Sequence, residues 1–222
     1  MFDECYLRNC VFDSCDFTGC RFASTNLHGS TFQGCKFDYC TFERTTIEND
    51  ILDSGCPGHE NLKMRFARSL RMNYQQLGDA KSANKSIQVE LQATEIYLHK
   101  AWRSNESYYR KKYAGLKRAK MFAEWLGFKT LDFVWGNGES TYKLLRSTLL
   151  LLAIIGFIDW IAFSHLSGLS GLARSAVLSP QIFFGLQSNQ DYPGVYATAI
   201  LLTRLTAIAF FLSIVIKRFN RR

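Results

Sequence analysis

An apolar side chain recurs at every fifth position over the first fifty residues of the chain. The series has eleven members without a slip: Phe2, Leu7, Phe12, Phe17, Phe22, Leu27, Phe32, Phe37, Phe42, Ile47 and Leu52. A small or polar residue, most often cysteine, stands two positions before each of them from Leu7 onward. A period of five belongs to neither an α-helix nor a β-strand. It therefore predicts a repeat architecture, in which each unit buries its apolar side chain against neighbouring units.

This segment resembles the pentapeptide-repeat family, whose four five-residue faces form one square β-helical coil of twenty residues. The resemblance implies a short right-handed β-helix (a β-solenoid) over residues 1–55. Residues twenty apart then stack, for example Phe2 on Phe22 and Phe22 on Phe42, at about the 4.8 Å spacing of strands in a sheet. We expect the apolar side chains to form ladders inside the coil and the small residues to fill its corners.

The seven cysteines raise the question of a disulfide or metal site. Six of them occupy the small-residue position of the repeat, no Cys-x-x-Cys motif occurs, and the four histidines are scattered. We therefore expect buried, reduced thiols that act as small hydrophobes, at positions where alanine, serine or threonine would serve equally. This interpretation predicts no metal and a cytosolic location for the repeat segment.

Charge and hydropathy divide the chain into three parts. Residues 1–55 carry nine acidic and four basic side chains, whereas the remainder carries an excess of basic ones. The predicted fold is mixed: the solenoid at 1–55, a helical hairpin and basic juxtamembrane connector at 56–140, and a two-span α-helical membrane domain at 141–222. The antiparallel helical hairpin is indicated by a side-chain stripe spaced by four before "LGD", residues 77–79, and by four and three after it.

Two apolar segments, 144–164 and 195–216, are each long enough to cross a ~30 Å hydrocarbon layer as a helix. Basic residues lie at the start of the first segment and just after the end of the second: Lys143, Arg146, Lys217 and Arg218. By the positive-inside rule, both termini are predicted to be cytoplasmic and the loop 165–194 extracytoplasmic. We therefore expect a multi-pass protein of a cell inner membrane.

Each predicted span contains one ion-forming side chain, Asp159 in the first and Arg204 in the second. Each lies thirteen residues from the basic flank, about 20 Å at 1.5 Å per residue, so antiparallel spans bring both to one level. Charged groups at this depth are costly and usually pair or face water. Three interpretations stay open: a structural salt bridge, charges that line a polar pathway between subunits, or snorkelling to the outer interface. Because a lone hairpin with two charges buries little, we expect a homo-oligomer.

The sequence between the spans indicates a short re-entrant helix at 172–186, followed by a polar, turn-rich exit. Span, short helix, polar loop and span together resemble the layout of two-span ion-channel pores. That resemblance implies a set of pore-loop residues: Gly185, Gln187, Ser188, Asn189 and Asp191. The loop lacks a Thr-Val-Gly-Tyr-Gly-like filter, so potassium selectivity does not follow from the resemblance. An ordinary extracytoplasmic connection is the alternative interpretation.

Residues 103–129 interleave tyrosines with eight Lys and Arg residues. Next to a span, this pattern is more typical of contact with anionic lipid headgroups than of subunit contact or of nucleic-acid binding. Trp125 and Trp135 are expected at the membrane interface, together with Lys217 and Arg218. We expect the lipid bilayer as a partner, and no nucleic acid.

The order of the repeat, the "LGD" hairpin, "WGNGE" at 135–139 and the two spans resembles bacterial pentapeptide-repeat proteins with an ion-channel-like C-terminus. The resemblance implies an oligomeric pore controlled by a cytosolic repeat module, with the role of a toxin or phage-defence effector as the biological hypothesis. The alternative is a membrane-anchored scaffold that binds a protein partner on its solenoid without conduction. A DNA-mimicking role, known in the family, would need a longer rod than the roughly 13 Å expected here. No catalytic spacing or phosphate-binding loop occurs, so neither an enzyme nor a cofactor is expected.

Overall fold

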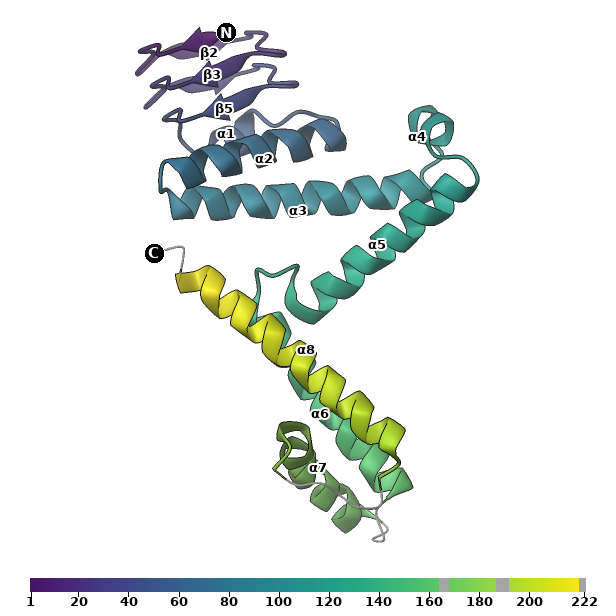
Figure 1. The fold of residues 1–222 in the computed structure, drawn as a ribbon. Helices are drawn as coiled ribbons and strands as arrows, with labels where there is room; N and C mark the ends of the chain where they lie inside the picture. The colour runs from purple at the N-terminus through teal and green to yellow at the C-terminus, as the bar shows by residue number, and fades with distance from the viewer. Residues whose placement is uncertain (164–167, 187–191, 220–222) are drawn as a thin grey trace. The chain divides into compact units, whose positions relative to one another are not determined.

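The computed structural model describes residues 1–163, 168–186 and 192–219. Residues 217–219 are described by their backbone alone. The chain forms two compact units, Met1–Leu126 and Gly127–Arg222, each of which is described separately. Figure 1 shows the order of the elements along the chain. The division into three domains at residues 55 and 140 stays a prediction.

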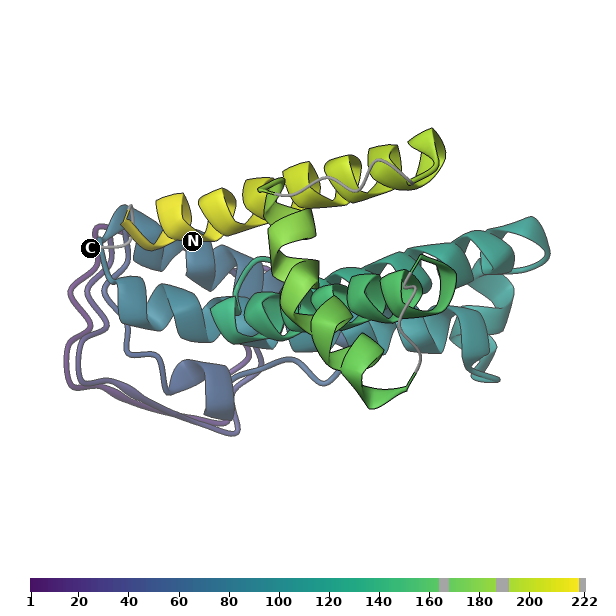
Figure 2. The ribbon, with the colours of Figure 1, turned by 90° about the horizontal axis from the view of Figure 1, so that it is seen from below.

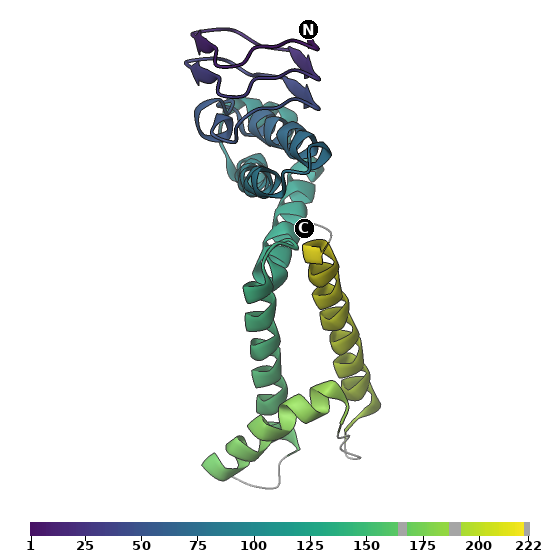
Figure 3. The ribbon, with the colours of Figure 1, turned by 90° about the vertical axis from the view of Figure 1, so that its left-hand side faces the viewer.

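The first unit begins with five short strands that pair in parallel. They are β1 (Phe2–Asp3), β2 (Val11–Asp13), β3 (Arg21–Ala23), β4 (Thr31–Gln33) and β5 (Thr41–Glu43). One sheet has the order β1-β3-β5 and the other β2-β4, with partners twenty residues apart. Figures 1 and 3 show the successive coils stacked. The predicted twenty-residue stacking is confirmed, and the short parallel sheets are consistent with a β-solenoid.

Phenylalanine ladders fill the interior of the coils. The ring of Phe22, which is 1 % exposed, lies between those of Phe2 and Phe42 at centroid distances of 4.8 and 5.2 Å. Phe12 stacks on Phe32 at 5.2 Å in the same way. The stacked rings lie nearly parallel, with interplanar angles of 4° to 6°. The ring of one coil therefore covers the face of the ring in the next coil.

The small-residue positions have a role beyond filling space. Their side chains donate hydrogen bonds to a carbonyl 23 residues earlier, in the preceding coil. The donors and acceptors are Thr25 to Phe2, Ser30 to Leu7, Cys35 to Phe12, Cys40 to Phe17 and Thr45 to Phe22. The expectation that alanine would serve equally is therefore wrong, since alanine has no donor. All seven cysteines are free, and burial raises the pKa of Cys40 to about 12.

Helix α2 (Glu60–Gln76) covers the open edge of the last coil. Unpaired edge groups invite association with other chains, and native proteins commonly cover them. Asn73 does so in both directions: its Oδ1 accepts from the Thr45 N–H at 2.7 Å and its Nδ2 donates to the Thr45 carbonyl at 2.8 Å. Ser69 and Gln76 accept from two further edge amides. The helix thus continues the hydrogen bonding of the solenoid with side chains.

We predict that Asn73→Ala loosens this edge by about 2–4 kcal/mol, because it leaves both the N–H and the C=O of Thr45 buried without partners. Hydrogen–deuterium exchange of residues 41–46 measures the opening free energy. Gln76→Ala is the matched control on the same helix: Gln76 is exposed, so water can replace it, and a change below about 0.5 kcal/mol is expected. Equal exchange in the two variants would contradict the capping role of Asn73.

Helix α2 and helix α3 (Ala80–Arg103) form the predicted hairpin. Gly78 makes the turn with φ +74°, and the Asp79 carboxylate accepts from the Ser82 N–H at 3.0 Å as the N-cap of α3. Burial opposes ionisation of Asp79, but these hydrogen bonds outweigh it and lower its pKa. The "LGD" motif is therefore a helix stop followed by a helix start. Three other helices complete the series up to residue 135: α1 (Ile51–Ser54), α4 (Ser107–Lys112) and α5 (Leu116–Trp135).

The second unit contains helices α6 (Thr141–Ala162), α7 (Leu169–Phe184) and α8 (Gly194–Phe219). Helices α6 and α8 are long and apolar enough to cross a membrane. Only 22 % and 11 % of their most apolar stretches are buried, whereas a core helix of a soluble protein is mostly buried. Figures 2 and 3 show α7 lying across this pair. With 16 residues, α7 is shorter than the roughly 20 that a span needs.

Candidate intramembrane polar site

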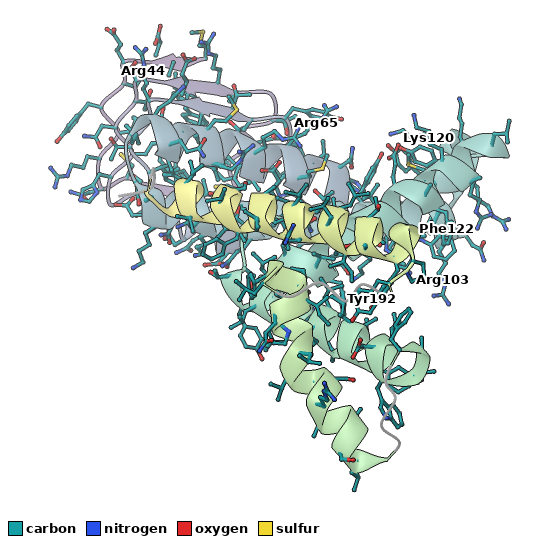
Figure 4. The ribbon with its side chains drawn as sticks, turned by 60° about the horizontal axis from the view of Figure 1, so that its bottom comes forward. Arg44, Arg65, Arg103, Lys120, Phe122 and Tyr192 are labelled. Atoms are coloured by element: carbon teal, nitrogen blue, oxygen red, sulfur yellow. The ribbon has the colours of Figure 1, made fainter. Side chains whose placement is uncertain are left out.

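Asp159 is the buried acidic residue of α6, with only 5 % of its surface exposed. One carboxylate oxygen accepts a hydrogen bond from the Ser175 hydroxyl on α7 at 2.7 Å. The other accepts from the Tyr192 hydroxyl, just before α8; Tyr192 is labelled in Figure 4. The carboxylate therefore joins three chain segments that are otherwise largely apolar. Hydrogen bonds of this kind are what make a buried acidic group tolerable.

Small residues bring α6 and α7 close enough for this contact. A Cβ added at Gly156 would lie 3.2 Å from the Ser175 carbonyl oxygen and 3.4 Å from the Ser179 Cβ. Close approach through small residues is typical of helix pairs in membranes. Pro180 cannot donate to the Ala176 carbonyl, which instead accepts from the Ser179 hydroxyl at 3.1 Å. The short helix thus keeps its backbone hydrogen-bonded despite an internal proline.

Arg204, on α8, reaches the end of α7 and not Asp159. Its Nη1 lies 2.0 Å from where a Cβ on Gly185 would stand, so the guanidinium rests against this glycine. Among the described residues no ion pair joins Asp159 to Arg204 within one chain, and the acid accepts hydrogen bonds from the hydroxyl groups of Ser175 and Tyr192. The equal depth inferred from the sequence left open which way each side chain points around its helix. A role for the two residues in a polar pathway stays a prediction.

Gly185 is the one predicted pore-loop residue that the structure describes. It ends α7 in the left-handed conformation, with φ +76° and ψ +21°, and its N–H bonds to the Ile182 carbonyl at 3.1 Å. This is an ordinary helix C-terminus for glycine. The predictions for Gln187, Ser188, Asn189 and Asp191 lie outside the described residues.

We predict that Gly185→Ala destabilises the second unit by about 1–2 kcal/mol through backbone strain, and also displaces Arg204. The melting temperature of the detergent-solubilised protein measures the first effect. Gly78→Ala is the control: it has φ +74° but nothing within 4 Å of the added Cβ, so it carries the strain alone. If removing the Arg204 side chain relieves none of the Gly185→Ala defect, the contact between the two residues is not significant.

The residues predicted at the membrane interface lie in different surroundings. Trp135 stacks on Phe210 of α8 at 4.3 Å. Trp125 instead belongs to an aromatic cluster of the first unit, with its ring 5.3 Å from that of Trp102. The backbones of Lys217 and Arg218 continue α8, and their side chains lie outside the description. Contact of any of these residues with lipid stays a prediction.

Sequence reasoning missed Ser175 and Tyr192 as partners of Asp159. Ser175 lies sixteen residues after Asp159 and Tyr192 thirty-three, so no local spacing connects them. The available indication was the excess of small residues in α7, which permits a close helix crossing. Within the described residues, no three His, Cys, Asp or Glu side chains gather as a possible metal site.

Comparison with known proteins bears on the N-terminal part of the chain. Residues 2–46 match the family model for pentapeptide repeats, with eight copies. Comparisons with curated proteins and with solved structures gave no match. The match supports a pentapeptide-repeat protein, whose chain also carries two helices long and apolar enough to cross a membrane.

Proposed function

We propose that this protein is an oligomeric integral membrane protein, whose C-terminal helices form an ion-channel-like or membrane-permeabilising pore. The pentapeptide-repeat segment controls the pore from the cytoplasmic side, where both termini lie. The setting is a bacterial inner membrane, and the biological role is that of a toxin or phage-defence effector.

One observation carries this proposal: two ionisable side chains in the apolar spans both contact the region of the short helix α7. Asp159 accepts a hydrogen bond from Ser175 within α7, and Arg204 rests against Gly185 at its end. Ionisable groups at membrane depth are costly and commonly mark an ion or proton pathway. A helix pair that served only as a tether does not need ionisable groups at this depth.

The proposed oligomerisation is supported by how little the two long helices cover each other. An apolar cavity of about 490 Å³ lies between α6, the end of α7 and α8. Large apolar side chains on both long helices are exposed, Leu149 and Leu212 at 58 % and 51 % among them. Lipid or neighbouring subunits must cover these surfaces in a membrane. A two-span subunit also needs copies of itself to enclose a pathway.

Induced expression in cells loaded with a potential-sensitive dye tests the proposal. The wild type is expected to depolarise the membrane. Asp159→Asn keeps the shape of the side chain but removes its charge, and should slow the depolarisation. Ile158→Leu, a volume-conserving change at the neighbouring position, should behave as the wild type. Normal polarisation in cells whose membrane fraction contains the wild-type protein would contradict the pore. It would favour the alternative, a membrane-anchored scaffold without conduction. A monomeric mass in detergent would also count against it.

A further inference from the structure

A basic cavity lies where the end of α5 meets the start of α6, within the second unit. Its volume is about 460 Å³, and its lining residues are Lys129, Thr130, Asp132, Phe133, Lys143 and Arg146. Three of the six are cationic and one is anionic, so the lining has an excess of positive charge. The cavity is distinct from the Asp159 site, with which it shares no residue.

Two contacts within this cavity fix its shape. Lys143 bonds both carboxylate oxygens of Asp132, at 2.8 and 2.7 Å, so these two charges neutralise each other. Arg146 donates from Nη2 to the Phe133 carbonyl at 2.6 Å, and its guanidinium carbon lies 4.4 Å from the centre of the Phe133 ring. The guanidinium is therefore held over the face of the ring by two contacts before any ligand arrives.

Arg146 retains hydrogen-bonding capacity after these contacts. Its bond to the Phe133 carbonyl uses one N–H, and a guanidinium offers five such donors. The guanidinium is a cation with further N–H donors, so a ligand with anionic acceptor oxygens suits it. Planar guanidinium groups match phosphate oxygens, to which they can donate two parallel bonds.

We propose that this cavity binds a phosphate group, presented either by an anionic phospholipid headgroup or as free phosphate. The inference rests on the proposed membrane insertion of α6 and α8, but not on conduction. Lys143 and Arg146 belong to the first two turns of α6, at the predicted cytoplasmic end of that span, where lipid phosphates lie. Basic pockets at such ends suit lipid headgroups. Bound there, a lipid phosphate would hold the end of α5 against the membrane surface.

The test uses the full-length protein in a neutral detergent. Melting temperature is followed while dioctanoyl phosphatidylglycerol, dioctanoyl phosphatidylcholine or inorganic phosphate is added. Phosphatidylglycerol is expected to raise the melting temperature and zwitterionic phosphatidylcholine to leave it nearly unchanged. Arg146→Gln should weaken the apparent affinity for phosphatidylglycerol about tenfold, since it removes a charge-assisted contact. Arg146→Lys keeps the charge but lacks the planar guanidinium. Its affinity for phosphatidylglycerol should lie between those of the wild type and Arg146→Gln.

Arg174→Gln is the matched control, because Arg174 is an exposed arginine of α7 that lies outside this cavity. It should bind phosphatidylglycerol as the wild type does. A response to inorganic phosphate as large as that to the lipid, and equally lost in Arg146→Gln, would assign free phosphate as the ligand. Equal lipid affinity in the wild type and in both Arg146 variants would overturn the proposal. Melting in the absence of lipid shows whether each variant is folded.

Because the measurement needs no ion flux, it separates this inference from the pore. A protein that binds phosphatidylglycerol through Arg146 but never depolarises cells would contradict the pore alone. A protein that depolarises cells while binding no phosphate group would contradict the site alone.

Discussion

Replacing Phe22 by alanine is expected to destabilise the repeat segment by about 3–5 kcal/mol, the usual cost of removing a buried aromatic ring. Phe22 is 1 % exposed and stacks on a ring of the coil above and of the coil below, so its loss interrupts one ladder in the middle. Every coil depends on its neighbours for burial, so the defect should spread along the stack.

Alkylation of Cys40 reports this loss. Cys40 is 4 % exposed, and burial raises the pKa of its thiol to about 12, so Cys40 in the folded segment reacts slowly with iodoacetamide. A loss of 3 kcal/mol raises the opened fraction about a hundredfold, and the labelling rate with it. Tyr6→Ala is the control, an aromatic side chain of the same segment that is 73 % exposed. Similar Cys40 labelling in Phe22→Ala and Tyr6→Ala would show that the ladder does not stabilise the solenoid.

The repeat could be predicted in detail because a single short sequence period determines which of its residues stack. A period of five with partners twenty apart determines which residues stack, and the observed pairing of Phe2 with Phe22 and Phe42 follows it. The capping of the last coil could not be predicted. Asn73 acts there only because α2 lies along the sheet edge with that side chain turned toward Thr45. The helical pattern of the segment gives its apolar face, but not its direction across another element.

The candidate site shows the same limit. Hydropathy and length identified the two candidate spans, and residue counts predicted a similar depth for Asp159 and Arg204. Depth along a helix does not determine rotation around it, so the partners depended on the packing of α7. That packing places the Ser175 hydroxyl on the acid and Gly185 beneath the arginine. The contacts of Asp159 and Arg204 are thus made between segments far apart in the sequence, and no short sequence spacing predicts them.

Replacing Gly156 by leucine should have the largest effect in the second unit, because it separates α6 from α7. Even a Cβ at this position would approach the Ser175 carbonyl oxygen to 3.2 Å and the Ala176 Cα to 3.5 Å. Backbone atoms cannot move aside as a flexible side chain can, so a branched side chain must push the whole helix away. Overpacking typically costs about 1–3 kcal/mol, and here it also removes the hydrogen bond from Ser175 to Asp159.

Hydrogen–deuterium exchange of α7, resolved by mass spectrometry on the detergent-solubilised protein, measures the result. Amides of residues 169–184 are expected to exchange faster in Gly156→Leu. Gly127→Leu is the matched control: it makes the same substitution at a helical glycine of α5 whose added Cβ has nothing within 4 Å. It should leave α7 unchanged, since the added Cβ meets nothing within 4 Å and leucine improves helix propensity. If α7 exchanges equally in the wild type and in Gly156→Leu, the close crossing does not hold the short helix in place. Asp159 would then have to keep its partners by some means other than this contact.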